Sequence, residues 1–150
     1  MRRSVVHVVS LALLAAPAIV AAQAPAKQVV TPQGQNASAN LSAGIKVGDM
    51  LYVSGQLGMR RNAPDTTIEG QTRIALENTK RVVEAAGATM ANVVKCTVFL
   101  VNVADFQPMN RVYREFFPSE PPARSTVVVA ALVSPGAKVE IECMAALPRQ

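Results

Sequence analysis

Histidine is almost absent from this sequence. The one histidine, His7, lies in the first 22 residues, which have the pattern of a secretory signal peptide. The mature chain is therefore expected to contain none. That absence excludes Ser-His-Asp triads, histidine general bases and histidine-ligated metals from any mechanism of the mature protein.

The signal peptide is predicted over residues 1–22. Arg2 and Arg3 form its basic start, an apolar run follows, and small residues permit cleavage after Ala22 or Ala24. An uncleaved membrane anchor is the alternative, but the small side chains of the run argue against it. No cysteine follows the run, so a lipoprotein anchor has no attachment point. We expect a periplasmic or secreted protein that does not contact the membrane after cleavage.

The chain is only mildly basic. The formal net charge of +5 falls to +3 once Arg2 and Arg3 are removed, and the chain has no block of lysines and arginines. This balance gives little support for nucleic-acid binding, and we expect no nucleic-acid partner.

The remaining chain has the size of one ordinary domain with a core of its own. Residues 23–40 are rich in alanine, glutamine, proline and serine and lack periodicity, which predicts a flexible leader. The folded domain is expected over residues 41–150.

The periodicity of this domain predicts two strands, a helix, a strand, a helix and two further strands. The expected elements are a hairpin of Leu41–Ile45 and Met50–Ser54, a helix with Thr66 as N-cap and a stop at Gly87, a strand over Val93–Val101, a helix from Asp105 to Pro118, and strands over Thr126–Val133 and Lys138–Ala145. Strand pairs separated by helices favour an α+β sandwich with its helices on one face of the sheet.

Arg124 lies at the start of an unusually apolar strand. Pro121 and Pro122 exclude a helix before it, and Thr126–Val133 lacks polar alternation, so both faces of that strand should be buried. One domain cannot readily cover the second face, so a partner subunit is expected there. A guanidinium at this position needs an anion. The anion is either a structural ion-pair partner or a carboxylate ligand that binds reversibly.

The last predicted strand carries two carboxylates. Glu140 and Glu142 fall on one face, about 6–7 Å apart, while the residues between them fall on the other. A solvated sheet face is the usual meaning of such a pair. If the strand lies beside Arg124, one glutamate becomes a candidate for holding a water near the ligand of that arginine.

Several motifs together carry a resemblance to a known family. They are Leu51–Gln56, Gln71 with Asn78, Val93–Leu100, Asp105-Phe106 with Asn110, Tyr113 and Phe116-Phe117, Pro122–Ser125, and Val139–Glu142. The chain resembles the RidA/YjgF family of reactive-intermediate deaminases from about Leu41 to Ala146. The resemblance implies a chorismate-mutase-like α+β fold, with a mixed sheet covered by two helices. It also implies a homotrimer with a site in each cleft between subunits.

The resemblance further implies a chemistry. Family members hydrolyse 2-imino and enamine acids to 2-keto acids and ammonia, and an already electrophilic imine needs no metal or cofactor. Arg124 would clamp the substrate carboxylate and Glu140 would position or activate the attacking water. The remaining site residues implied by the family are Gly55 and Thr126, which would line the pocket through backbone groups, and Ser54 and Asn110 as polar neighbours.

The chain departs from the family at one site residue. Leu41 stands where the family has a tyrosine, and it cannot donate a hydrogen bond. The leading hypothesis is a hydrolytic deaminase of a small carboxylate-bearing imine. The alternatives are a non-catalytic trimer that binds small carboxylates and a holdase-like trimer outside the cytoplasm. A nuclease gains little support from the modest charge.

The two cysteines, Cys96 and Cys143, are the minimum for a disulfide, which an oxidising compartment would permit. Each is expected on the apolar face of its own strand, where cysteine usually behaves as a small hydrophobe. A bridge would also need neighbouring strands in register. We therefore predict two free, buried thiols.

Overall fold

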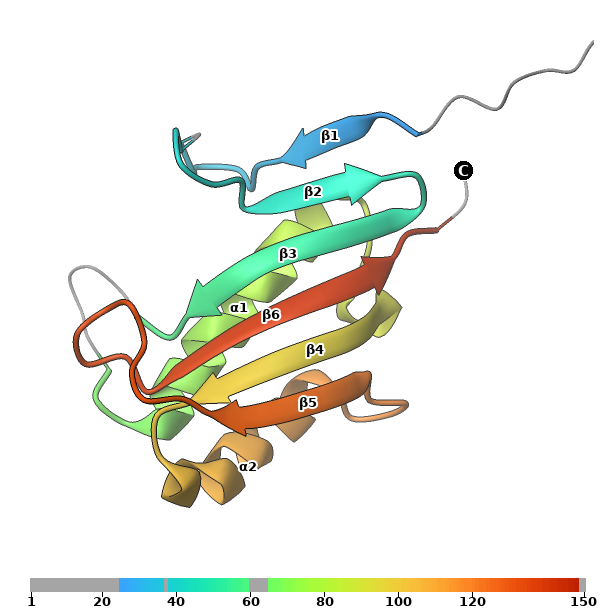
Figure 1. The fold of residues 1–150 in the computed structure, drawn as a ribbon. Coiled ribbons are helices and arrows are strands. Elements are labelled where there is room, and N and C mark those ends of the chain that lie inside the picture. The colour runs from blue at the N-terminus through green and yellow to red at the C-terminus, as the bar shows by residue number, and fades with distance from the viewer. Residues whose placement is uncertain (1–24, 37, 60–64, 149–150) are drawn as a thin grey trace, which may run out of the picture.

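The computed structural model describes residues 25–36, 38–59 and 65–148, so the predicted signal peptide and its cleavage sites lie outside the described residues. A six-stranded sheet has both helices on one face, and its other face carries no helix (Figure 1). The elements are β1 (Lys27–Val30), β2 (Gly44–Val47), β3 (Met50–Leu57), α1 (Ile68–Ala85), β4 (Val93–Leu100), α2 (Phe106–Phe116), β5 (Ala123–Val128) and β6 (Val139–Ala146), with single 3₁₀ turns at Met90–Asn92 and Val103–Asp105.

The strand order across the sheet is β1-β2-β3-β6-β4-β5. Neighbouring strands are antiparallel except β4 and β5, which are parallel. The connections β3–α1–β4 and β4–α2–β5 both cross toward the β5 edge. Because such crossovers are right-handed almost without exception, both helices fall on the same face. The predicted mixed sheet covered by two helices is confirmed, as is the predicted order of elements from β2 to β6.

The ends of α1 are set by local hydrogen bonds. Thr67 is its N-cap, one residue later than predicted, and the Thr67 hydroxyl accepts from the Gly70 N–H at 3.1 Å. Asp65 accepts from the Thr67 N–H at 2.8 Å, which fixes the turn before the helix. At the other end Gly87 has φ +82° and donates to the Glu84 carbonyl, so the predicted glycine stop is confirmed.

The core lies between the sheet and the two helices. Buried residues alternate with less buried ones along β6, in β4 from Cys96 onward and in the first half of β3, as in period-two strands with one covered face. The largest fully buried apolar side chains are Leu51, Leu76, Leu100, Met109, Ile141, Val82, Val83, Val98 and Val139. No helix in the described ranges is long and apolar enough to cross a bilayer.

The prediction of two free thiols was wrong, because Cys96 and Cys143 form a disulfide. The antiparallel register of β4 and β6 places them directly opposite each other, with their Cα atoms 4.1 Å apart. Both side chains point into the core, as expected, but the cross-strand register also brings their sulfur atoms together. That register arises only when the two strands pair in the folded chain, and the sequence of either strand alone does not determine it.

Part of the predicted flexible leader is a strand. Lys27–Val30 forms β1, which pairs antiparallel with β2 at the edge of the sheet. Val30 is buried by this pairing, although the three residues before it are exposed. Backbone hydrogen bonds to β2 therefore order a segment whose own side chains bury little apolar surface.

The predicted boundaries of the Arg124 strand were also wrong. β5 ends at Val128, and Val129–Val133 lies beyond it. β5 is the edge strand, and Val127 and Val128 are 43% and 53% exposed in the single chain. By its register with β4, Val127 lies on the helix-free face and Val128 on the helix side, so the single chain leaves part of both faces of β5 exposed, and the expected cover from a partner subunit stays a prediction.

Candidate functional site

Arg124 lies on the helix-covered side of β5, against aromatic rings of α2. Its guanidinium carbon is 4.5 Å from the ring centroid of Tyr113 and 5.9 Å from that of Phe106. Both distances lie within the range of cation–π attraction. None of the ion pairs among the described residues involves Arg124. The aromatic rings thus hold the guanidinium in place while leaving its hydrogen-bonding edge without a carboxylate from the described chain.

A hollow of about 410 Å³ opens beside this guanidinium. Its lining consists of Gln107, Asn110, Tyr113, Arg114, Pro121, Pro122 and Arg124. The structure therefore brings Asn110 and Arg124 together, as the predicted site requires. The two prolines contribute to the lining because they hold the chain before β5 in an extended conformation.

Tyr113 is a buried residue that lines this hollow and contacts Arg124. Its side chain is 4% exposed, and its hydroxyl has no hydrogen-bond partner among the described residues. Burial raises the pKa of Tyr113 to about 12, against the smaller opposing effect of the Arg124 charge. From the sequence, Tyr113 was identified only as part of a family motif, and its contact with Arg124 was not predicted.

Gly55 and Glu140 form a second group on the opposite face of the sheet. β3 contains one extra residue between Val53 and Gln56 relative to β6, and Gly55 lies in this bulge. A Cβ atom at Gly55 would clash with the Glu140 carboxylate. Glycine is therefore required here for the carboxylate to lie against the β3 backbone.

The other two predicted site residues lie apart from each other. The Ser54 hydroxyl donates to the Ser42 carbonyl at 2.6 Å, so it already has a partner in the segment before β2. Thr126 lies in β5, opposite Val98 and two residues after Arg124. Leu41, in place of the family tyrosine, is 62% exposed and lines a separate hollow of about 90 Å³.

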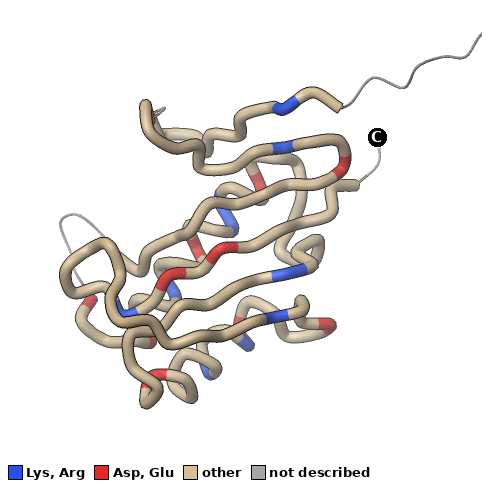
Figure 2. Tube along the Cα trace, viewed as in Figure 1, with Lys and Arg blue, Asp and Glu red and all other residues tan. Residues whose placement is uncertain are grey.

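The sheet separates Arg124 from Glu140. Arg124 pairs with Cys96, whose side chain is buried on the helix side, whereas Glu140 pairs with Phe99 three residues further along β4. Paired residues share a face and successive residues alternate, so the two side chains lie on opposite faces. β4 also separates β5 from β6 (Figure 2). One chain therefore does not bring Arg124 and Glu140 together, and the condition set for a carboxylate of this strand beside Arg124, that the two strands are neighbours, is not met within one chain.

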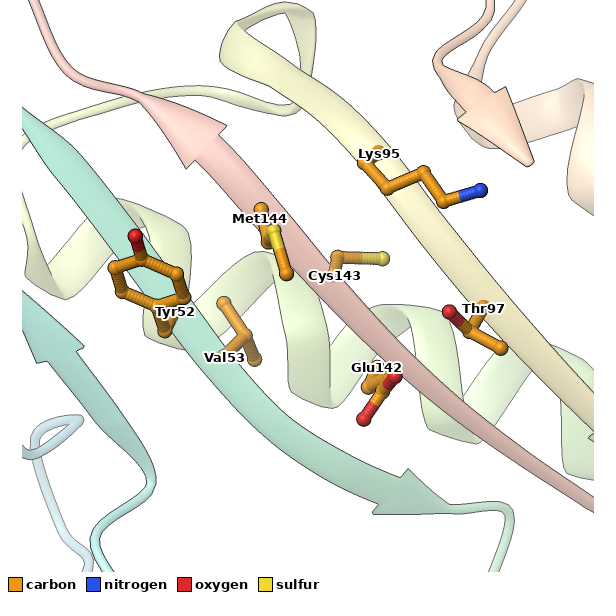
Figure 3. A pocket seen from close by; sticks show the side chains of 7 residues that line it. All are labelled: Tyr52, Val53, Lys95, Thr97, Glu142, Cys143 and Met144. Carbon is orange, nitrogen blue, oxygen red and sulfur yellow. The ribbon is translucent and has the colours of Figure 1, made fainter. Parts of the chain in front are cut away.

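The helix-free face has a small hollow of its own, of about 130 Å³ (Figure 3). Its polar lining includes Lys95, Thr97 and Glu142, and the Lys95 ammonium donates to the Ser125 hydroxyl at 2.7 Å. None of the predicted site residues lines it. Over the described parts of the chain, no group of three or more histidine, cysteine, aspartate or glutamate residues is arranged to hold a metal ion.

Comparison with known proteins gives consistent matches. A family model described as endoribonuclease L-PSP matches residues 31–147. A 2-iminobutanoate/2-iminopropanoate deaminase of Dermatophagoides farinae is 44% identical over 121 residues, which span 79% of this chain and 94% of that protein. The chloroplastic Reactive Intermediate Deaminase A of Arabidopsis thaliana is 39% identical over 135 residues, or 85% of this chain and 70% of that protein.

Solved structures match over the same region. A putative endoribonuclease L-PSP of Entamoeba histolytica superposes with a TM-score of 0.74 at 40% identity, covering 81% of this chain and all of that one. TdcF of E. coli with bound serine gives a TM-score of 0.73 at 32% identity, covering 81% of this chain and 99% of that one. These neighbours share the fold described above.

Proposed function

Since the chain belongs to the RidA/YjgF (endoribonuclease L-PSP) family, we propose that it hydrolyses reactive 2-imino acids to 2-keto acids and ammonia. The relatives that carry the name 2-iminobutanoate/2-iminopropanoate deaminase include the mite protein and a human protein 35% identical over 120 residues. In the reaction a water oxygen adds to the imine carbon, and the C–N bond of the resulting carbinolamine then breaks to release ammonia.

The observation that carries this proposal is the state of Arg124. Its guanidinium is held on the Tyr113 ring, and no ion pair from the described chain neutralises it. A planar fork can bind a carboxylate through two parallel charge-assisted hydrogen bonds. Arg124 would hold the substrate carboxylate in this way and so fix the imine carbon relative to the attacking water.

Glu140 is the proposed partner for that water. Its carboxylate lies against the backbone at Gly55, where a side chain would displace it. A carboxylate fixed in this way can accept a hydrogen bond from water and draw off a proton as the water attacks. Because Gly55 has no side chain, it leaves room for the Glu140 carboxylate and so determines where this proposed base lies.

We propose that the two residues meet across a subunit interface. Because they lie on opposite faces of one sheet, Arg124 of one copy and Glu140 of a second copy must form each site. The open face and the exposed edge residues Val127 and Val128 offer a surface for that second copy. A homotrimer with a site in each cleft closes such heterologous contacts into a ring.

The experiment is a decay assay on an imine made in situ. An L-amino acid oxidase converts L-2-aminobutyrate to 2-iminobutanoate, and semicarbazide traps the imine that escapes hydrolysis. Purified mature protein should reduce the trapped fraction, and Arg124→Lys and Glu140→Gln should abolish that effect. Glu142→Gln is the matched control, since Glu142 lies on the same strand and face, two residues further on. If the wild type leaves the trapped fraction unchanged, the protein is not an imine deaminase.

The alternative is a binding module for small carboxylates without turnover. The serine-bound neighbour favours it, since serine carries a carboxylate and is bound intact in that structure. Stabilisation by 2-oxobutanoate without accelerated imine decay would support this alternative.

We also propose that the protein acts in the periplasm or outside the cell. Its first 22 residues have the pattern of a signal peptide. The Cys96–Cys143 disulfide supports export, because structural disulfides persist mainly in oxidising compartments. Detection of the mature chain in the periplasmic or culture fraction would test this. Retention of the uncleaved chain in the cytoplasm would refute it.

A further inference from the structure

The hollow beside Arg124 has a second guanidinium in its lining, that of Arg114. We propose that Arg114 selects substrates with a second anionic group, so that the preferred substrate is a 2-imino dicarboxylate such as the imine of glutamate. This inference rests on the proposed function and names the substrate class of the same site.

The polar residues of α2 in this hollow share one face of the helix. Gln107, Asn110 and Arg114 are spaced at i, i+3 and i+7, which places them within one narrow stripe. The stripe extends about 10 Å along the helix axis at the standard rise per residue. Arg114 lies in the last turn, directly after Tyr113, whose ring carries the Arg124 guanidinium. Both cations line this one hollow.

The charges around the hollow are of one sign. Its lining contains two arginines and no acidic residue. Two other arginines of the helices have carboxylate partners: Arg111 pairs with Glu69 at 3.0 Å and Arg73 with Glu115 at 2.6 Å. Arg114 takes part in none of the ion pairs found in the described chain. Two cations beside one cavity, without acidic neighbours in its lining, concentrate anions there.

The size of the hollow is consistent with a ligand larger than a four-carbon monocarboxylate. Its volume of about 410 Å³ lies within the range of small-molecule sites. When Arg124 binds one carboxylate of the substrate, the guanidinium of Arg114 can bind a second carboxylate of the same molecule. Asn110 lies four residues before Arg114, on the same stripe, and its amide offers a hydrogen-bond donor and acceptor to a ligand in the hollow.

The test compares two product analogues and two substrates on the mature protein. Calorimetry should show that 2-oxoglutarate binds about tenfold or more tightly than 2-oxobutanoate. Arg114→Gln should remove that preference by weakening 2-oxoglutarate alone. Arg111→Gln is the matched control, since it removes one arginine of the same helix that does not line the hollow. The kcat/KM for imines made from glutamate and from 2-aminobutyrate should follow the same pattern.

Each outcome separates this inference from the reaction on which it rests. If imines are hydrolysed but the preference is absent, or Arg114→Gln weakens both ligands equally, Arg114 is not a specificity residue and the proposed reaction stands. If no imine is hydrolysed but Arg114 still governs 2-oxoglutarate binding, only the reaction fails. If neither keto acid binds, the inference is wrong.

Discussion

Reduction of the Cys96–Cys143 disulfide should destabilise the protein by about 4 kcal/mol. The bond joins residues 47 positions apart, and the chain-entropy relation gives about this value for a loop of that length. Both cysteines lie in the core, on the neighbouring interior strands β4 and β6 of the sheet. The bond therefore restricts the unfolded chain while it adds little to a native register that β4 and β6 already form.

The assay is urea unfolding with and without a phosphine reductant, at one protein concentration, because subunit association would also change the apparent stability. Reductant should lower the free energy of unfolding by about 4 kcal/mol. Thiol labelling after unfolding without reductant should detect no free thiol, and labelling after reduction should detect both.

The double variant Cys96→Ala/Cys143→Ala is the control, since its unfolding curve should not respond to reductant. Two labelled thiols in unfolded wild-type protein without reductant would mean that no bond exists. A bond that is present but whose reduction leaves the curve unchanged would refute the entropic reasoning.

Three further substitutions probe the fold and the site. Gln71→Met should destabilise the protein by about 3 kcal/mol in urea unfolding, because the buried Gln71 amide accepts from the Lys138 N–H and donates to two carbonyls that would lose their partner. Tyr113→Phe should be neutral or stabilising by about 1 kcal/mol, since the hydroxyl that it removes is buried without a partner in the described chain. Because the Tyr113 pKa is raised to about 12, the unfolded state loses this proton first, so wild-type stability should fall between about pH 10 and 12 relative to Tyr113→Phe. Gly55→Ala should abolish imine hydrolysis by displacing Glu140, and normal activity would refute the role of that contact.

Hydrophobic periodicity and the glycine and proline stop signals predicted most helices and strands, because these signals depend on residues that are close together in the sequence. The alternation in β6 and the glycine stop at Gly87 both depend on residues within one turn or strand, and both are confirmed. β1 was missed because Lys27–Val30 is ordered by pairing with β2 rather than by its own pattern. The N-cap was placed one residue early because Thr66 and Thr67 are equally suitable cap residues by sequence.

Some of the candidate site residues lie near one another as predicted, but their full arrangement could not be predicted from the sequence. Arg124 and Asn110 do line one hollow, and Gly55 does make room for Glu140. The register of β4 with β5 and with β6 is a tertiary feature, and it decides that Arg124 and Glu140 point to opposite faces. The spacing of Gln107, Asn110 and Arg114 was a signal in the sequence that could have identified the polar stripe of α2.

Complementation between two inactive variants tests the central claim most directly, namely that Arg124 and Glu140 act together from different copies. Arg124→Lys and Glu140→Gln are each expected to be inactive, and co-refolding equal amounts should restore imine hydrolysis. In a randomly assembled ring about a quarter of the sites would combine the intact Arg124 of one copy with the intact Glu140 of its neighbour. Recovery near that level is the predicted result. Mixtures that stay as inactive as the separate variants, while mixed oligomers are shown to form, would contradict the two-copy site.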